Sequence, residues 1–276
     1  MSWTPGKPTA AYAEPGKCVF GDAWTAVPLI SKVAISHDTR IFTFGLSEGT
    51  ALGLSTCACL LMKGPADAEG NPVIRPYTPV STNAMLGQFE LMIKVYPDGK
   101  MTQHLEGLEM GAQVEFKHVG GNVKIQYPFN KKQKLGMLVG GTGVTPMIQA
   151  LHVALGTEGD TSTVSMLYGS KTSDDILARE TVDAWAASAS ERFSVTHVLS
   201  NEPDGSAWSG ARGFISKELI EKSMPGPDTD CLIFICGPPP MYAALSGPRD
   251  APGQPPSELA GLLKDMGYKT EQVIKF

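Results

Sequence analysis

Residues 135–147 read LGMLVGGTGVTPM, and this stretch predicts a strand, a glycine-rich turn and the start of a helix. The apolar run Leu135–Gly140 is typical of a buried strand, and Pro146 fits the first turn of a helix, where its missing N–H is not needed. Glycines allow a tight turn and let a ligand touch the backbone, while the free N–H groups of a helix start attract phosphate. Because the spacing is not GxGxxG, the segment is either a nucleotide-binding turn or a structural strand-to-helix turn.

The chain around and beyond this stretch alternates strands with helices. The further predicted strands are Thr163–Tyr168, Phe193–Leu199 and Cys231–Ile235. The predicted helices are Pro146–Leu155, Asp174–Ala187, Lys217–Ser223, Pro239–Leu245 and Glu258–Met266. Such alternation indicates βαβ units around a parallel sheet, so residues 135–276 are expected to form an α/β domain.

Residues 24–127 contain short strands with turn residues between them. The predicted strands are Pro28–Ile35, Arg40–Leu46, Ala58–Met62, Val73–Tyr77, Gln88–Tyr96 and Gln113–Lys117. Many short strands at this spacing are typical of an antiparallel sandwich or barrel. One short helix, Thr102–Leu108, interrupts them, and Thr102 is its expected N-cap.

The expected fold therefore has two domains, an N-terminal antiparallel β-barrel followed by an α/β domain with a parallel sheet. Residues 1–23 are expected to form a loose lead-in, because their first twenty positions are rich in Pro, Gly and Ala without periodicity. Residues 128–134 are the expected hinge. Two unlike domains in one chain offer a crevice between them, where ligands commonly bind.

The composition excludes several classes of protein. A chain of 276 residues, 42% of them hydrophobic, can bury a core without disulfides or metals. The net charge of −5 and the lack of a basic run argue against nucleic-acid binding. No apolar run approaches the ~20 residues of a membrane-spanning helix. The five cysteines cannot all pair and contain no CxxC, so reduced thiols, an intracellular compartment and no bound metal are expected.

Three further motifs combine polar side chains with a restrained or flexible backbone. In RPYTPVS at residues 75–81, two prolines hold the chain extended, so Arg75 is presented to a pyrophosphate and Tyr77 to a flat ring, unless the segment is simply an edge strand. GKMT at residues 99–102 starts the short helix and forms either an anion site or an ordinary turn. CGPPPM at residues 236–241 follows a strand, at the edge where α/β ligands bind, and Cys236 is either reactive or inert core.

Taken in their order along the chain, at residues 75–81, 94–103, 140–147 and 236–241, the four motifs resemble those of the NADH–cytochrome b5 reductase family, within the ferredoxin–NADP⁺ reductase superfamily. The resemblance covers about residues 24–276 and includes KVYPDGKMTQ at 94–103 and the terminal VIKF at 273–276. The stretches CACLL at 57–61 and LLKDMGY at 262–268 look most like the mitochondrial-type reductases of plants and fungi.

The resemblance implies FAD in the barrel domain and NADH on the α/β domain. The implied FAD-binding residues are Arg75, Pro76, Tyr77, Thr78, Lys94, Tyr96, Gly99, Lys100, Met101, Thr102 and Thr145. The implied NADH-binding residues are Gly140, Gly141, Thr142, Gly143, Pro146, Ser200, Cys236, Gly237, Pro238, Met241 and Phe276. Among these, Thr78, Thr145 and Cys236 are the expected catalytic residues.

The implied reaction passes a hydride from NADH to the flavin and then single electrons to the haem of cytochrome b5. No acid–base triad is needed, and the scattered histidines are interpreted as structural. One alternative keeps the fold and changes the acceptor to another haem protein, a quinone or a ferric chelate. The non-enzyme alternative is a binding module without flavin.

The resemblance also bears on partners and location. Cytochrome b5 has an acidic surface, so Lys63, Lys94, Lys100 and Lys124 are candidates for its docking face. We expect a monomer without a membrane span, in mitochondria (the outer membrane or intermembrane space), with the cytoplasm as the alternative.

One departure from the family concerns the choice of nucleotide. Ser200-Asn201 stand where the family often has an acid, which would bind the ribose hydroxyl and repel a 2′-phosphate. NADH remains the expected donor, because no Arg or Lys lies within residues 199–204 and Arg212 is the nearest downstream cation. NADPH is the alternative.

Overall fold

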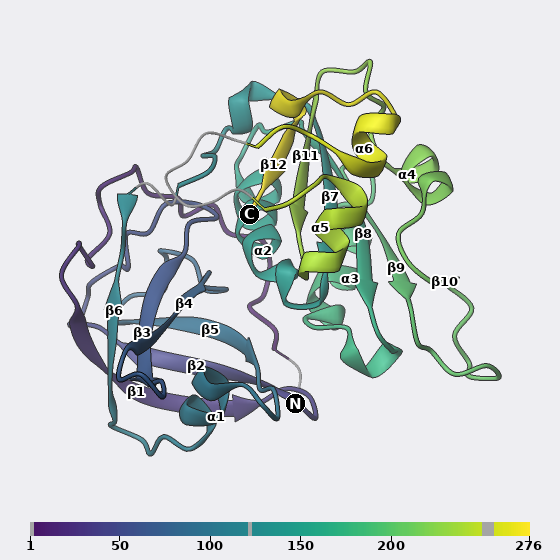
Figure 1. Cartoon of the computed structure of the whole chain (residues 1–276). Coiled ribbons are helices and arrows are strands. Elements are labelled where there is room, and N and C mark those ends of the chain that lie inside the picture. The colour runs from purple at the N-terminus through teal and green to yellow at the C-terminus, as the bar shows by residue number, and fades with distance from the viewer. Residues whose placement is uncertain (1–2, 121–122, 250–256) are drawn as a thin grey trace.

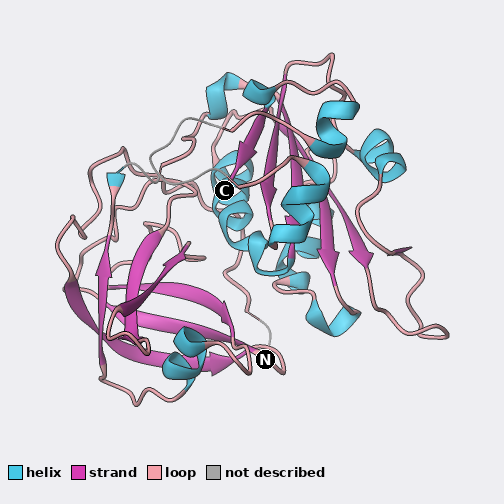
Figure 2. Cartoon of the chain, in the orientation of Figure 1, coloured by secondary structure: helices cyan, strands magenta, loops and turns pink. Residues whose placement is uncertain are grey.

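The computed structural model describes residues 3–120, 123–249 and 257–276 and shows two six-stranded sheets. The antiparallel sheet is formed by the N-terminal part of the chain and the parallel sheet by the C-terminal part (Figure 1). Helices surround the second sheet, and the short helix α1 (Lys100–Glu106) accompanies the first (Figure 2). The predicted two-domain fold is confirmed. Within the described ranges, no helix is long and apolar enough to cross a membrane.

The first sheet has the strand order β4-β3-β6-β1-β2-β5. Its strands are β1 (Thr25–Ala34), β2 (Thr39–Gly45), β3 (Leu60–Ala66), β4 (Pro72–Tyr77), β5 (Gln88–Lys94) and β6 (Gln113–Lys117). Beyond β4, the N–H of Val80 donates to the carbonyl of Glu90 in β5 at 2.9 Å, and Ser81 Oγ accepts from the Glu90 N–H at 2.9 Å. These two bonds link the edge strands, so the sheet closes into a barrel.

The barrel core is built on a group of aromatic rings. Phe20, Phe44, Phe89 and Phe116 contact one another with ring centroids 4.8–5.8 Å apart, and each is at most 2% exposed. Alternation along a strand sends every second side chain to this interior. Each ring contributes roughly 1.5–3 kcal/mol through burial, which fixes the register of the strands that carry it.

The second sheet has the order β10-β9-β8-β7-β11-β12, with parallel pairing throughout. Its strands are β7 (Lys134–Gly140), β8 (Thr163–Ser170), β9 (Phe193–Leu199), β10 (Ala211–Arg212), β11 (Cys231–Cys236) and β12 (Val273–Lys275). Its helices are α2 (Val144–Gly156), α3 (Arg179–Ser188), α4 (Lys217–Ser223), α5 (Pro239–Leu245) and α6 (Gly261–Asp265). The carboxyl ends of β7, β8, β9 and β11 therefore lie along one edge.

The two faces of this sheet are covered by different helices, because strand residues alternate between faces. Met137 and its face pack with α2 and α3, whereas Leu138 and the opposite face pack with α4, α5 and α6. The first of these buried clusters continues into the barrel, since it includes Ile41, Val80 and Met92. One apolar cluster thus spans the two domains, in addition to the aromatic core of the barrel.

The described part of the expected lead-in, residues 3–23, forms no helix or strand but is docked on both domains at single residues. Trp3 Nε1 donates to Glu90 Oε2 in the barrel at 3.0 Å, while the Trp3 carbonyl accepts from Thr181 Oγ1 of α3 at 2.7 Å. Further along, the Thr9 N–H donates to His152 Nδ1 of α2 at 3.0 Å. Composition did not reveal this docking, because its contacts are made by single residues with distant partners.

Three predicted helices differ from the observed ones. The short barrel helix α1 spans Lys100–Glu106, so Gly99 is its N-cap and Thr102 lies in its first turn. The predicted helix Asp174–Ala187 is divided into a 3₁₀ turn, η4 (Ser173–Asp175), and α3, because Ala178 adopts a left-handed conformation with φ of 53°. The predicted helix Glu258–Met266 shortens to α6.

Two short strands were not predicted. β10 has two residues and β12 has three, lengths at which alternation gives no signal. β12 pairs with β11 and places the C-terminus against the domain junction, where Phe276 packs on Phe234 at a ring distance of 5.5 Å.

Candidate functional site

The glycine-rich turn and the Cys236 motif are in direct contact at the carboxyl edge of the parallel sheet. A Cβ at Gly143 would overlap the carbonyl oxygen of Cys236, and a Cβ at Gly140 would lie 2.7 Å from Pro238 Cδ and 2.8 Å from Met241 Sδ. Both positions therefore require glycine, and the two motifs form one surface.

The turn itself is the 3₁₀ segment η3 (Gly141–Gly143), which leads into α2. Gly141 has φ of +53° and no atom within 4 Å of where a Cβ would stand, so its backbone faces open space. Behind it, Tyr168 Oη donates to the Gly141 carbonyl at 3.2 Å, and Thr145 Oγ1 donates to the Thr142 carbonyl at 3.2 Å. The turn is thus held from its inner side and presents backbone outward, as a nucleotide phosphate requires.

The segment 75–81 lies at the edge of the barrel that faces the second domain. Arg75 is exposed, and its Nη1 donates to the adjacent Ile74 carbonyl at 2.8 Å, so most of its donors remain available. Tyr77 is half-buried, and burial raises the pKa of its phenol to about 12, which keeps it neutral. A guanidinium beside a neutral aromatic ring suits the pyrophosphate and ring system of FAD.

Hydrogen bonds across the domain junction hold this segment against α2. Gln149 Nε2 donates to the carbonyls of Pro79 and Ser81 at 2.8 and 2.7 Å. The Cys57 thiol donates to the Pro146 carbonyl at 3.2 Å. The start of α2, and with it the glycine turn, is therefore fixed next to the Arg75 segment.

The helix start at residues 99–102 is built mostly from internal contacts. Met101 is buried and reaches Gly64, while Thr102 Oγ1 accepts from the Tyr96 N–H at 3.1 Å and donates to the Gly99 carbonyl at 3.2 Å. α1 packs on β3 and β4, so the exposed Lys100 lies on the side of the barrel that carries the Arg75 segment. The side chains of Met101 and Thr102 are structural, which leaves their backbone to meet a ligand.

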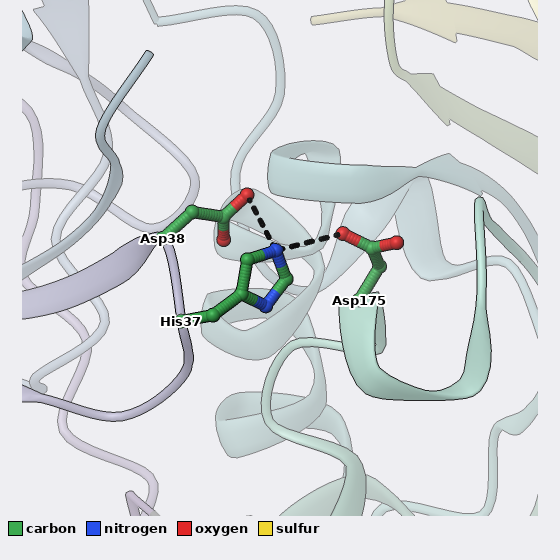
Figure 3. Close-up of side chains that lie close together, drawn as sticks. All are labelled: His37, Asp38 and Asp175. Carbon is green, nitrogen blue, oxygen red and sulfur yellow. Dashed lines mark ion pairs between the residues drawn. The ribbon is translucent and has the colours of Figure 1, made fainter. Parts of the chain in front are cut away.

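Lys94 lies in a charge cluster between the two domains. Its Nζ is 2.6 Å from Asp38 Oδ2 of the β1–β2 turn and 3.0 Å from Asp175 Oδ1 of η4. His37 points toward both carboxylates, with Nε2 3.3 Å from Asp38 Oδ2 and 3.8 Å from Asp175 Oδ1 (Figure 3). His37, Asp38 and Asp175 have the spacing of metal ligands, but the Lys94 ammonium already supplies the cation, so we read the cluster as an interdomain ion pair.

The carboxylates of this cluster are ionised. Burial raises the pKa of Asp38 and of Asp175, but the hydrogen bond and charge of Lys94 outweigh burial, so each pKa lies below its ordinary value. Burial lowers the pKa of Lys94, and the hydrogen bonds that its ammonium donates to both carboxylates more than reverse that effect. The two domains are therefore joined by an ion pair whose carboxylates and ammonium are all charged around neutral pH.

Cys236 ends β11 beside the glycine turn. Burial raises the pKa of its thiol to about 11, so the side chain is a neutral thiol at pH 7. Neighbouring Tyr242 donates its hydroxyl to the carbonyl of Phe276, which anchors the chain terminus. Phe276 is 6% exposed and belongs to the core shared by both domains.

The edge beyond β8 and β9 carries residues that sequence reasoning did not single out. The Ser200 N–H donates to the Ser170 carbonyl at 3.0 Å, so the loop after β9 lies against the loop after β8. Glu202 reaches across to Ser173, and Phe214, 82% exposed, follows Gly213, whose N–H donates to the Leu199 carbonyl at 2.8 Å.

The structure brings the glycine turn and the Cys236 motif together, and Gln149, in the helix that follows the turn, binds the 75–81 segment of the barrel. Ser200 lies further along the sheet edge, and Tyr96 is 49% exposed. Gln149, Asp38 and Asp175 were missed. Gln149 offered a weak signal, as an amide within the apolar run of α2.

Comparison with known proteins agrees with this division of the chain. The profile of the oxidoreductase FAD-binding domain matches residues 26–127, and that of the oxidoreductase NAD-binding domain matches residues 137–246. A solved structure, the cytochrome b5 reductase domain of Ulva prolifera nitrate reductase, is 29% identical with a TM-score of 0.77, covering 97% of this chain and 100% of that one.

Curated relatives match almost the whole chain. The NADH-cytochrome b5 reductase-like protein of Arabidopsis thaliana is 39% identical over 92% of this chain and 77% of its own length. The NADH-cytochrome b5 reductase 2 of Scheffersomyces stipitis is 38% identical over 95% of this chain and 87% of its own length. With an FAD-binding oxidoreductase domain followed by an NAD-binding one, and with these relatives, the chain belongs to the NADH–cytochrome b5 reductase family.

Proposed function

We propose that the protein is an FAD-dependent oxidoreductase that transfers electrons from NADH through flavin to cytochrome b5. The observation that carries this proposal is the junction at which Gln149 ties the Arg75 segment to the helix behind the glycine turn. It brings a flavin-type site and a nucleotide-type site, from separate domains, next to each other. Both curated relatives described above are named as reductases of this reaction or as similar to them.

On the barrel side, the proposed FAD contacts fit the residues present. The open donors of Arg75 would meet the pyrophosphate, the ring of Tyr77 and the hydroxyl of Thr78 would face the isoalloxazine and ribityl, and the backbone of residues 99–102 would hold the adenosine end. When bound, FAD supplies the conversion between a two-electron donor and a one-electron acceptor. The protein contributes position, since Thr145 approaches the same junction from α2.

On the α/β side, the outward backbone of Gly141–Gly143 would bind the NADH pyrophosphate, and Gly237, Pro238 and Met241 would shape the neighbouring wall. Cys236 would lie beside the nicotinamide as a neutral thiol, where it orients the ring and excludes water. Phe214 is placed to cover the adenine, because it is exposed beside the loop after β9. Residues 24–127 and 135–276 are the proposed FAD and NADH domains.

The acceptor face would lie near the flavin edge and would be basic, because cytochrome b5 is acidic. Of the four candidate lysines, Lys94 is bound to Asp38 and Asp175, and Lys63 pairs with Glu115 at 2.7 Å. Lys100 and Lys124 make no ion pair among the described residues, so they are the better docking candidates. A monomer in the mitochondrial outer membrane or intermembrane space remains our expectation.

The direct test is to purify the protein, record its visible spectrum and measure NADH-dependent reduction of cytochrome b5. We expect bands of oxidised flavin, about one FAD per chain, and reduction of the haem with saturation in both substrates. A colourless protein that binds neither FAD nor NADH would overturn the proposal. Flavin reduction by NADH without haem reduction would overturn only the identity of the acceptor.

A further inference from the structure

We propose that Glu202 supplies the charge that selects NADH over NADPH, a role that the sequence pattern places at residue 200. The inference rests on the proposed function, since it names the nucleotide that the site accepts. The polar groups of Ser200 bind neighbouring residues. Its Oγ donates to Asn201 Oδ1 at 2.9 Å, and its N–H donates to the Ser170 carbonyl. The sequence has no acid at residue 200, but the fold holds the carboxylate of Glu202 at the same edge of the parallel sheet.

Glu202 reaches this edge because the loops after β8 and β9 lie side by side. The Asn201 N–H donates to the Lys171 carbonyl at 2.8 Å, which aligns the two loops residue by residue. One position further, Glu202 Oε2 accepts from the Ser173 N–H at 2.7 Å and Oε1 accepts from Ser173 Oγ at 3.2 Å. The carboxylate is therefore held across the carboxyl end of β8, next to Ser200.

This carboxylate is fixed and ionised. The backbone hydrogen bond from Ser173, together with side-chain hydroxyl donors, lowers the pKa of Glu202 below its ordinary value. With Ser173 and Ser206 as its donors, the carboxylate still has lone-pair capacity for a ribose hydroxyl. A 2′-phosphate in that place would set its negative charge beside Glu202 instead.

Arg212, the nearest cation downstream of this loop, uses its hydrogen-bond donors within the loop itself. Its Nη1 donates to the carbonyls of Glu202 and Pro203, and its Nη2 donates to Ser206 Oγ and the Trp208 carbonyl. Four of its five N–H donors are thus used to shape the loop that carries Glu202. The guanidinium keeps its charge, so Arg212 and Lys171, which is exposed on the neighbouring loop, are the cations whose charges oppose that of Glu202.

The test compares Glu202→Gln with Asp204→Asn. Glutamine keeps an oxygen for the Ser173 N–H and removes only the charge, so the loop should stay folded. Asp204 is an exposed acid of the same loop, and its side chain has no hydrogen bond or ion pair in the described parts of the chain. Its substitution changes the net charge equally without touching the proposed contact.

The first readout is calorimetric binding of 2′,5′-ADP and of 5′-AMP to the FAD-loaded protein, which needs no turnover. We expect Glu202→Gln to tighten 2′,5′-ADP by roughly five- to tenfold and to leave 5′-AMP within about twofold. Asp204→Asn should change neither by more than about twofold, since an exposed charge further away is screened. The second readout, the ratio of kcat/KM for NADH to that for NADPH, should fall in parallel for Glu202→Gln alone.

Unchanged 2′,5′-ADP affinity in Glu202→Gln, or an equal gain in Asp204→Asn, would overturn the role of Glu202. Either result would leave electron transfer from NADH intact. If the wild-type protein instead fails to reduce its flavin with any nicotinamide nucleotide, the proposed function fails, and the binding comparison still reports on the adenosine site.

Discussion

Gly143 contacts Cys236 so closely that a single added Cβ at residue 143 would overlap the Cys236 carbonyl oxygen. The end of β7 and the end of β11 are thereby locked together at the position where a nicotinamide nucleotide would lie across them.

Gly143→Ala should destabilise the α/β domain by about 1–3 kcal/mol, because the methyl group must displace backbone rather than a flexible side chain. Urea unfolding measures this loss, and NADH affinity should fall with it. Gly169→Ala is the matched control, since its Cβ would stand 3.4 Å from the nearest atom, the Val139 carbonyl oxygen. Equal stability of the two variants would contradict the close approach.

Lys94→Met should cost about 1–3 kcal/mol at neutral pH, since it leaves Asp38 and Asp175 facing each other without their cation. The control is Lys132→Met, which breaks the more exposed pair with Asp230 and should cost less than about 1 kcal/mol. Thermal melts of both variants against wild type measure the difference.

The same ion pair predicts a pH dependence of stability. The folded-state pKa values of Asp38 and Asp175 lie below their ordinary value of 3.8, so their contribution is present above that pH and is lost as the pH falls through the lowered values. The pKa of Lys94 is raised above 10.5, so its contribution is present below pH 10.5 and is lost as the pH rises through the raised value. The stability gap between wild type and Lys94→Met should narrow at both extremes. A gap that stays constant from pH 3 to pH 11 would show that the pair contributes nothing by charge.

Arg75→Ala should weaken FAD binding by roughly 1.5–3 kcal/mol, the value of a charge-assisted hydrogen bond, without changing the fold. The folding should be spared because the Arg75 side chain is exposed and, among the residues that the structure describes, bonds only to Ile74. Flavin fluorescence during dilution measures the affinity, and Arg179→Ala in α3 serves as the control. Unaltered retention of FAD would place the pyrophosphate elsewhere.

Cys236→Ser should slow reduction of the flavin by NADH while FAD stays bound, because the thiol acts by position. Since burial raises the thiol pKa to about 11, the wild-type rate should show no thiol ionisation between pH 6 and pH 9. Stopped-flow absorbance measures both effects. Detection of a covalent substrate adduct on Cys236 during turnover, by mass spectrometry, would rule out the positional role.

Ser200→Asp should raise the NADH to NADPH efficiency ratio further, by about 1–2 kcal/mol, chiefly by impairing NADPH. The new carboxylate would add its charge beside that of Glu202. Steady-state kinetics with both nucleotides measure the ratio. An unchanged ratio would mean that the ribose does not lie at this loop.

Motif order and periodicity were sufficient to predict the two domains and their strands. Six barrel strands, and four strands of the parallel sheet, could be located because each has enough residues to show alternation or an apolar run. β10 and β12 were missed because two or three residues carry no period. The division of the predicted helix at Ala178 was missed because its left-handed backbone belongs to an alanine, a residue type that gives no local signal for that conformation.

The candidate site divides in a similar way. The sequence by itself was enough to identify the glycines, the prolines and Arg75 as candidate site residues, because turns, extended segments and phosphate contacts depend on residue type and local spacing. Only the tertiary structure decided that Lys94 pairs with Asp175 rather than standing free, that Gln149 joins the two domains, and that Glu202 binds Ser173. These contacts link residues 81, 68 to 70 and 29 positions apart, so they arise only when distant elements come together in the fold, which no local pattern encodes.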